Sequence, residues 1–169
     1  MMRITVPEKK IQEAVTQGMD TFVQCFYDAI WEAIGCQLTT QNMQELHPDQ
    51  VTLIAYMTLR EEVMDGGFIQ LIYNGYGPFI FLNPFAKAMR LWGAREMCNL
   101  IYDGRRLFEQ YGEEIARPCT DEEFMARFEQ YPMFDDLDDR FVEMEEEVTE
   151  LVAHYIDGHI SNFVEVTKD

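Results

Sequence analysis

The chain has 169 residues, which is enough for one domain with a hydrophobic core. Hydrophobic residues make up 47% of it, a share that excludes a disordered acidic chain, and 31 Asp and Glu against 13 Lys and Arg give a net charge of −18. A surface of this sign repels nucleic acid and anionic lipid and attracts basic proteins, so we expect no direct binding of nucleic acid.

The first predicted element is a helical segment over residues 7–34. Its apolar residues recur at spacings of three and four, as in a helix with one buried face: Ile11, Val15, Met19, Phe22, Phe26 and Ile30. The segment is one long helix, or two helices separated near Gly18, where Asp20 could cap the second. A short helix is expected next, over residues 40–46.

The following helix is predicted to begin at Pro48, since proline is favoured at the first helical position. It should end at Gly66 and Gly67, because glycine adopts the left-handed backbone angles that close a helix. Residues 68–77 are aromatic and rich in glycine without a clear period. We predict a buried turn of helix there, followed by a loop.

The second half of the chain contains four more predicted helices. One covers residues 84–92 and ends at Gly93, and the next ends at Gly112. Thr120 begins a capping box, which predicts a helix that runs to about residue 130. The last helix is expected from residue 136 or 138 to residue 159, with one apolar face and a second face that is almost entirely carboxylate.

Signals for β-strands are weak throughout the chain, because no alternating tract of β-branched residues reaches six positions. We therefore predict an all-α fold, in which about six to eight helices form a single compact domain over residues 1–169. Four scattered cysteines are predicted to be reduced thiols. With no signal peptide and no long apolar stretch in the sequence, we expect a cytoplasmic protein without membrane association.

The most distinctive motif lies at residues 62–74. Two glycines end a helix and are followed by residues that would anchor the turn in the core; the motif positions are Glu62, Asp65, Gly66, Gly67, Phe68, Gln70 and Asn74. The motif resembles the E-V-x-[ND]-G-G-F-x-Q-x-x-x-N signature of a bacterial DNA-mimic protein family, whose domain is one of unknown function. Met64 and Asp65 stand where the family has two asparagines.

The resemblance covers about residues 45–160 and leaves the helical segment 7–34 as an addition at the N-terminus. It implies an all-helical fold. For at least one relative it also implies competition with DNA for a transcription factor through a surface of carboxylates.

A dense acidic segment spans residues 135–150. Nine acidic residues stand there against Arg140 alone: Asp135, Asp136, Asp138, Asp139, Glu143, Glu145, Glu146, Glu147 and Glu150. A helix of this length extends roughly 24 Å, so it carries one net charge per about 3 Å, while one DNA strand carries a phosphate per about 3.4 Å. We predict that these nine residues form the surface that binds a partner.

Catalysis and metal binding have little support in the sequence. The acidic segment lacks the glycine of a calcium loop, and the three histidines have no nucleophile or zinc motif at a recognisable spacing. We therefore predict no catalytic residues, no metal, no cofactor and no enzymatic activity. One alternative is an enzyme or a small-ligand module with a pocket lined by Glu62, Asp65, Gln70 and Asn74.

The predicted function is that of an acidic DNA mimic in transcription regulation. It would occupy the DNA-binding surface of a basic protein such as a transcription factor. A further alternative is an inert acidic interaction domain, in which the charge only maintains solubility. A homodimer is possible under either reading.

Overall fold

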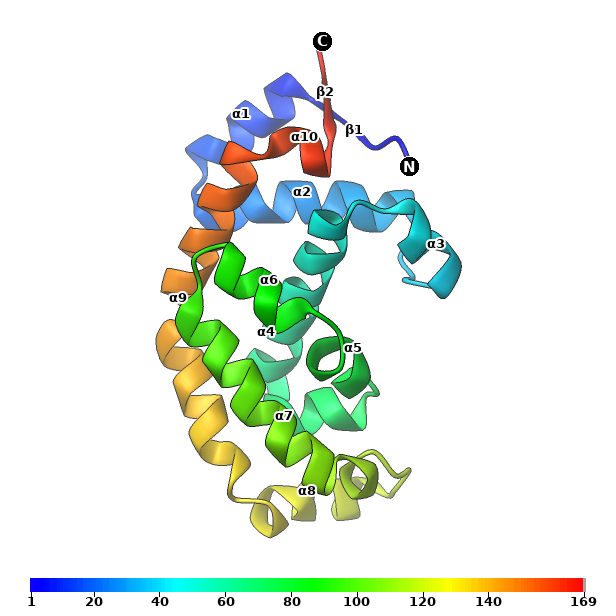
Figure 1. Cartoon of the computed structure of the whole chain (residues 1–169), viewed down its shortest axis with the longest axis vertical. Helices are drawn as coiled ribbons and strands as arrows, with labels where there is room; N and C mark the ends of the chain where they lie inside the picture. Colours follow the sequence, from blue (N-terminus) through cyan, green and yellow to red (C-terminus); the bar gives the residue numbers. More distant parts are fainter. Residues whose placement is uncertain (169) are drawn as a thin grey trace. The chain divides into compact units, whose positions relative to one another are not determined.

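The computed structural model describes residues 1–168, which form ten helices and two short strands (Figure 1). The contacts between Cα atoms divide the chain into two compact units. The first unit contains Met1–Met57 and the residues from Glu147 onward, and the second contains Thr58–Glu146. Two long helices, α4 (Pro48–Tyr73) and α9 (Phe134–Gly158), contribute residues to both.

The first unit begins and ends with a strand. Besides its parts of α4 and α9, the unit contains β1 (Thr5–Pro7), α1 (Glu8–Thr16), α2 (Met19–Ala33), α3 (Thr40–Glu45), α10 (Ile160–Phe163) and β2 (Glu165–Thr167). The two strands pair in parallel, with Thr5 opposite Glu165. Three-residue strands are too short to show alternation, which is why the sequence did not predict them.

The N-terminal segment forms two helices rather than one. Gly18 separates α1 from α2 at a φ of 113°, a value that L side chains rarely adopt. The N-cap residue of α2 is Gly18, and Asp20 lies in the first turn of the helix, so the expectation that Asp20 would be the capping residue is wrong.

Aromatic packing and buried polar contacts hold the first unit together. The rings of Phe26 and Phe163 meet edge to face, with their centroids 6.3 Å apart. The hydroxyl groups of Tyr56 and Thr149 lie 2.6 Å apart, and the buried Gln50 amide donates to the carbonyl of Phe163 at 2.6 Å. These contacts join the start of α4 to the end of α9 and to α10.

The second unit packs shorter helices against the remaining parts of α4 and α9. They are α5 (Gly77–Phe81), α6 (Phe85–Leu91), α7 (Arg95–Ile115) and α8 (Asp121–Gln130). Phe68 lies in the middle of the core, stacked on Phe81 and edge to face with Phe141. Thr120 accepts a hydrogen bond from the N–H of Glu123, which confirms the threonine half of the predicted capping box, while the Glu123 carboxylate accepts from the Thr120 hydroxyl at 3.2 Å.

Helix α4 is broken at its two adjacent glycines. Gly66 has φ −143° and ψ 16°, and Gly67 has φ 75° and ψ −177°, a combination open essentially to glycine alone. The predicted end of the helix is thus a kink, after which the chain resumes a helix as far as Tyr73. The loop expected after the turn begins later than the sequence suggested.

Two predicted helix ends differ from the structure. Helix α7 continues past Gly112 to Ile115. A side chain at Gly112 would collide with Phe108, so this glycine allows close packing and does not end the helix. Helix α9 begins at Phe134, before the predicted residue 136.

The predicted all-α class is confirmed. Of the ten helices in residues 1–168, seven have seven residues or more, in agreement with the expected six to eight. No helix in this described part is long and apolar enough to cross a membrane. The single domain over residues 1–169 stays a prediction.

Candidate functional site

The outer side of α9 in the second unit carries five exposed carboxylates. They belong to Asp135, Asp136, Asp139, Glu143 and Glu146, and we call this set the acidic face. At about 100° of rotation per residue, the five lie within roughly 100° of arc around the helix. The buried residues Leu137, Phe141 and Met144 lie on the opposite side.

The spacing of the acidic face resembles that of phosphates along DNA. From Asp135 to Glu146 the helix rises roughly 16 Å, so the four intervals between the five carboxylates average about 4 Å. Successive phosphates of one strand of DNA lie about 3.4 Å apart along its axis. Like charges three and four residues apart destabilise a helix by about 0.2–0.5 kcal/mol a pair, so this density has a cost in stability.

Most of the acidic face has no cation beside it. Arg140 approaches Asp136, with 3.6 Å between nitrogen and oxygen, and makes a closer contact of 3.0 Å with Asp103 of α7. Within residues 1–168 the other four carboxylates form no ion pair. Their charge is therefore open to a partner.

Asp138 was predicted to belong to the acidic surface, but its side chain points into the protein. The carboxylate accepts a hydrogen bond of 2.8 Å from the backbone N–H of Phe68, at the start of the second half of α4. A side chain at Gly67 would collide with this carboxylate. Burial, as the largest cause, and the neighbouring charges of Asp135 and Asp139 together raise the pKa of Asp138 to about 6, against the lowering effect of the hydrogen bond from Phe68.

Glu145 was also predicted to face a partner and is only 8% exposed. Its carboxylate pairs with Arg60 of α4, with 2.7 Å between Nε and Oε1. Asp138 and Glu145 therefore attach α9 to α4 inside the second unit.

The last two predicted acidic residues, Glu147 and Glu150, belong to the part of α9 in the first unit. Both are exposed. Glu150 has the ring of His154 at 3.7 Å, an ion pair only when that imidazole is protonated.

The motif at residues 62–74 forms a network of side chains across the kink of α4. The Gln70 amide donates to Glu62 and to Asp65, each at 2.9 Å, and the Asn74 amide donates to Glu62 at 2.9 Å. The two acceptors precede the kink and the two donors follow it. The polar groups of the motif are thus bonded to one another.

The motif therefore has a clear role in the fold. Gly66 leaves room for the side chain of Gln70, and Gly67 leaves room for Asp138. Phe68 fills the core, and its N–H is capped from α9. The motif holds the two halves of α4 at a fixed bend, beneath the helix that carries the acidic face.

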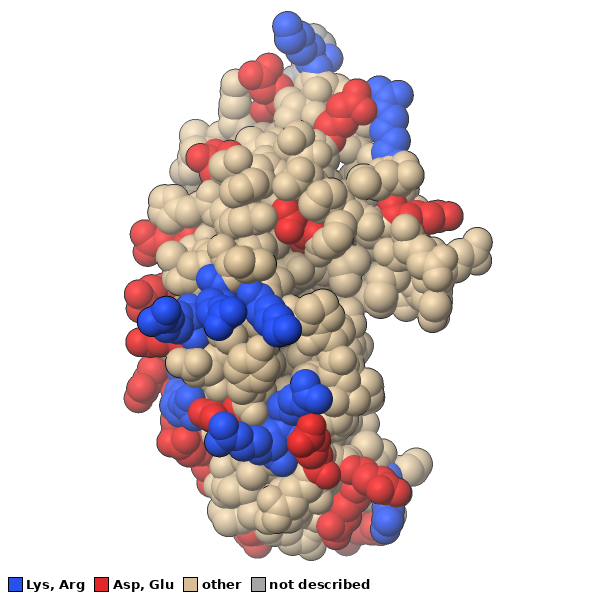
Figure 2. Space-filling view, in the orientation of Figure 1, with Lys and Arg blue, Asp and Glu red and all other residues tan. Residues whose placement is uncertain are grey.

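A group of basic residues on α6 and α7 escaped the sequence analysis. Residues 85–106 contain five basic and two acidic side chains, a net charge of +3 in a chain of −18. We call the five exposed residues the basic band: Lys87, Arg90, Arg95, Arg105 and Arg106. Figure 2 shows Lys and Arg gathered over α6 and α7, with Asp and Glu along the edge formed by α9. A charge count over residues 85–106 alone would have detected the band, but the net charge of the whole chain conceals it.

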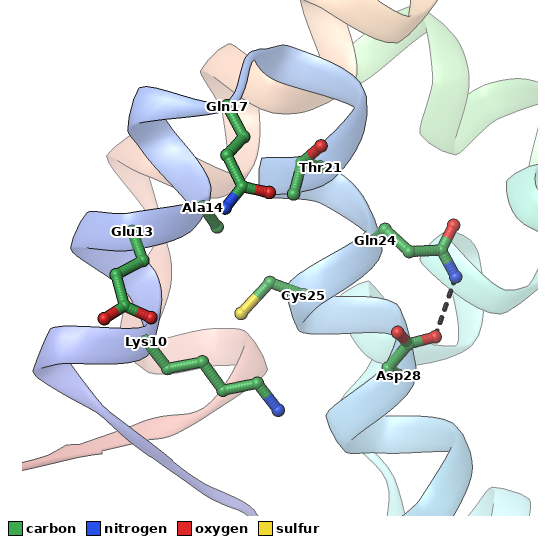
Figure 3. A pocket seen from close by; sticks show the side chains of 8 residues that line it. All are labelled: Lys10, Glu13, Ala14, Gln17, Thr21, Gln24, Cys25 and Asp28. Atoms are coloured by element: carbon green, nitrogen blue, oxygen red, sulfur yellow. Dashed lines mark hydrogen bonds between the residues drawn. The ribbon is translucent and has the colours of Figure 1, made fainter.

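A groove of about 230 Å³ opens between α1 and α2 in the first unit. The side chains of Lys10 and Cys25 point into it (Figure 3). Burial raises the pKa of the Cys25 thiol, which therefore stays protonated at neutral pH and is a poor nucleophile. Among residues 1–168, no three His, Cys, Asp or Glu side chains come together in a way that could hold a metal ion.

Comparison with known proteins adds two findings. Residues 44–159 match the family model described as DMP19-like protein, close to the predicted span of 45–160. The chain is also 28% identical over 167 residues to the DNA mimic protein DMP19 of Neisseria meningitidis serogroup B. That alignment covers 98% of each chain, so it includes the N-terminal helices that the family model does not reach. The resemblance inferred from the motif is confirmed.

Proposed function

The chain belongs to the DMP19-like protein family, and from this premise we propose that it acts as a DNA mimic. Its acidic face occupies the DNA-binding surface of a basic protein, such as a transcription factor, and blocks access to DNA. The observation that carries the proposal is the set of five solvent-exposed carboxylates on one side of α9, of which four have no cation beside them in the described chain.

Physical properties of the acidic face support this function. A DNA-binding protein gains much of its affinity from Lys and Arg side chains placed against phosphates. Carboxylates at similar intervals present the same charge to those side chains. A rigid helix also presents them without a cost for ordering, since Asp138 and Glu145 fix α9 to α4.

The residues of the family motif support it indirectly. They hold the bend of α4, and the backbone N–H of Phe68 donates to Asp138 of α9. The motif therefore fixes the position of the helix that carries the acidic face. Their polar groups bond to one another, which gives no support to a ligand pocket built from them.

The test is displacement of proteins from DNA. Extract of the source organism is loaded on a DNA column at low salt, and the purified protein is then applied as the eluant. We expect it to release a limited set of basic DNA-binding proteins and to bind each of them after purification. An unrelated protein without net charge, applied at the same concentration, should release none of them.

A pair of charge-matched variants separates location from total charge. The test variant changes Asp139, Glu143 and Glu146 to Lys. The control changes Glu13, Glu32 and Glu45, which are exposed in the first unit, to Lys. Both move the net charge from −18 to −12. The proposal predicts that only the test variant loses displacement; equal behaviour of the two variants would contradict it.

A further inference from the structure

The basic band is an exception on an acidic protein. All five of its side chains are exposed, and Leu91 between Arg90 and Arg95 is 81% exposed. Arg105 pairs with Glu109 and Arg106 with Asp103. Within residues 1–168, the remaining three cations, Lys87, Arg90 and Arg95, form no ion pair. They are free to bind an anionic group.

The band adjoins the acidic face within the second unit. Helices α6 and α7 pack together, and Asp103 of α7 lies 3.0 Å from Arg140 of α9. The same Arg140 reaches Asp136 of the acidic face at 3.6 Å, and Asp103 meets Arg106 of the band at 3.7 Å. A chain of alternating charges thus joins the two surfaces, which Figure 2 shows side by side.

Adjacent surfaces of opposite sign restrict what can bind across both. A partner that is basic throughout would meet repulsion as soon as it extended from α9 onto α7. A DNA duplex on the band would lie close to the acidic face, and charges within about 8 Å of each other are poorly screened at physiological salt. A partner that is complementary to both the acidic face and the basic band must therefore carry positive and negative charges side by side.

We propose that the acidic face and the basic band together select a DNA-binding protein whose basic surface is bordered by an acidic segment. The basic surface lies on α9 and the acidic border lies on α6 and the start of α7, where Leu91 offers an apolar contact. This inference rests on the proposed function and adds the charge pattern of the partner. It also explains why a strongly acidic protein keeps a basic band beside its binding surface.

The experiment uses two synthetic peptides as probes and the full-length protein. One peptide carries lysines along its whole length. The other has a lysine block followed by a block of glutamate and leucine. The test variant changes Lys87, Arg90 and Arg95 to Glu. The control changes Lys9, Lys10 and Lys168, which are exposed in the first unit, to Glu, so that both variants have a net charge of −24.

The proposal predicts opposite responses to the two probes. Relative to the control, the band variant should bind the two-block peptide about tenfold more weakly, since three favourable contacts become repulsive. It should bind the all-lysine peptide at least as tightly as the control. Equal binding of the two-block peptide by the two variants would overturn the inference.

Other outcomes identify other occupants. Retention of a 20-base-pair DNA duplex by the wild type, lost in the band variant, would show that the band binds nucleic acid and would overturn the proposal. Self-association of the wild type in sedimentation, lost in the band variant alone, would show that the band binds a second copy of this protein. That result would also overturn the proposal. If reversal of Asp139, Glu143 and Glu146 left binding of the all-lysine peptide unchanged, the proposed function itself would fail.

Discussion

Asp138 and Glu145 each precede, by one residue, a carboxylate that points into solvent. On the inner side of α9, Asp138 caps the kink of α4 and Glu145 pairs with Arg60. On the outer side, Asp139 and Glu146 form no ion pair within residues 1–168. The four residues have the same chemistry and belong to one helix.

The difference between these two sets lies in what surrounds each carboxylate. The inner carboxylates have partners inside the second unit, so their loss costs stability. The outer carboxylates repel one another, so their loss should cost none and should affect only binding. This contrast separates the part of the acidic segment that maintains the fold from the part that is available for function.

The largest expected effect comes from neutralising one residue of each set. Glu145→Gln leaves the guanidinium of Arg60, whose side chain is 23% exposed, without its carboxylate. We expect a loss of about 2 kcal/mol in the free energy of unfolding, below the value for a fully buried pair because water reaches both groups. Glu146→Gln should change it by less than about 0.5 kcal/mol. Urea unfolding measures both, and similar losses would remove the distinction.

A smaller effect should appear in the pH dependence of stability. Burial holds the pKa of Asp138 at about 6, above its ordinary value of 3.8, so the folded protein takes up this proton more readily than the unfolded chain. The stabilisation from protonation is complete below about pH 4 and is lost as the pH rises through 6. Asp138→Asn keeps an oxygen that accepts the hydrogen bond from Phe68 and removes the titration.

The wild type should therefore gain stability relative to Asp138→Asn when the pH falls from 7 to 5. Since the side chain is partly in contact with water, we expect a relative gain on the order of 1 kcal/mol. Urea unfolding of both proteins at the two pH values measures it. Glu143→Gln is the control on the outer side, because Glu143 is not among the charges that shift the pKa of Asp138, and it should follow the wild type. A parallel response of wild type and Asp138→Asn would contradict the assignment.

The smallest effect should be a gain in stability on the outer side. Glu143→Lys turns repulsion from Asp139 and Glu146 into attraction at spacings of four and three residues. We expect the free energy of unfolding to rise by about 0.5 kcal/mol and the melting temperature by roughly 1–2 °C. The same variant should release less protein from the DNA column. A lower melting temperature would show that the outer carboxylates also support the fold.

Most of the fold could be predicted from local patterns. The period of the apolar residues located the long helices, and the capping box at Thr120 located the start of α8. Gly112 and the pair Gly66 and Gly67 illustrate the limit, because a glycine can end a helix, bend it or make room for a neighbour. Gly112 makes room for Phe108, four residues earlier in the same helix, but Gly67 makes room for Asp138, which is far along the chain and which no local pattern connects to it.

The candidate site could be predicted only in part. The acidic density of residues 135–150 was visible in the sequence. Asp139 and Glu146 are seven residues apart, about two helical turns, so they could have been placed on one side of the helix. The inward positions of Asp138 and Glu145 depend on Phe68 and Arg60 in a distant helix, so composition alone could not reveal them. The basic band was within reach of a local charge count.

The order of the two units along the chain has a consequence for synthesis on the ribosome. Residues 58–146 form one continuous unit, whereas the other unit needs both the first 57 residues and those from Glu147 onward, including the strand pair of β1 with β2. Contacts within residues 58–146 can form once that stretch has left the ribosome, whereas β1 cannot pair with β2 until the last residues emerge. We therefore expect the nascent protein to complete the region with α6, α7 and the acidic face first, while its earliest-made residues wait for the last ones to leave the exit tunnel.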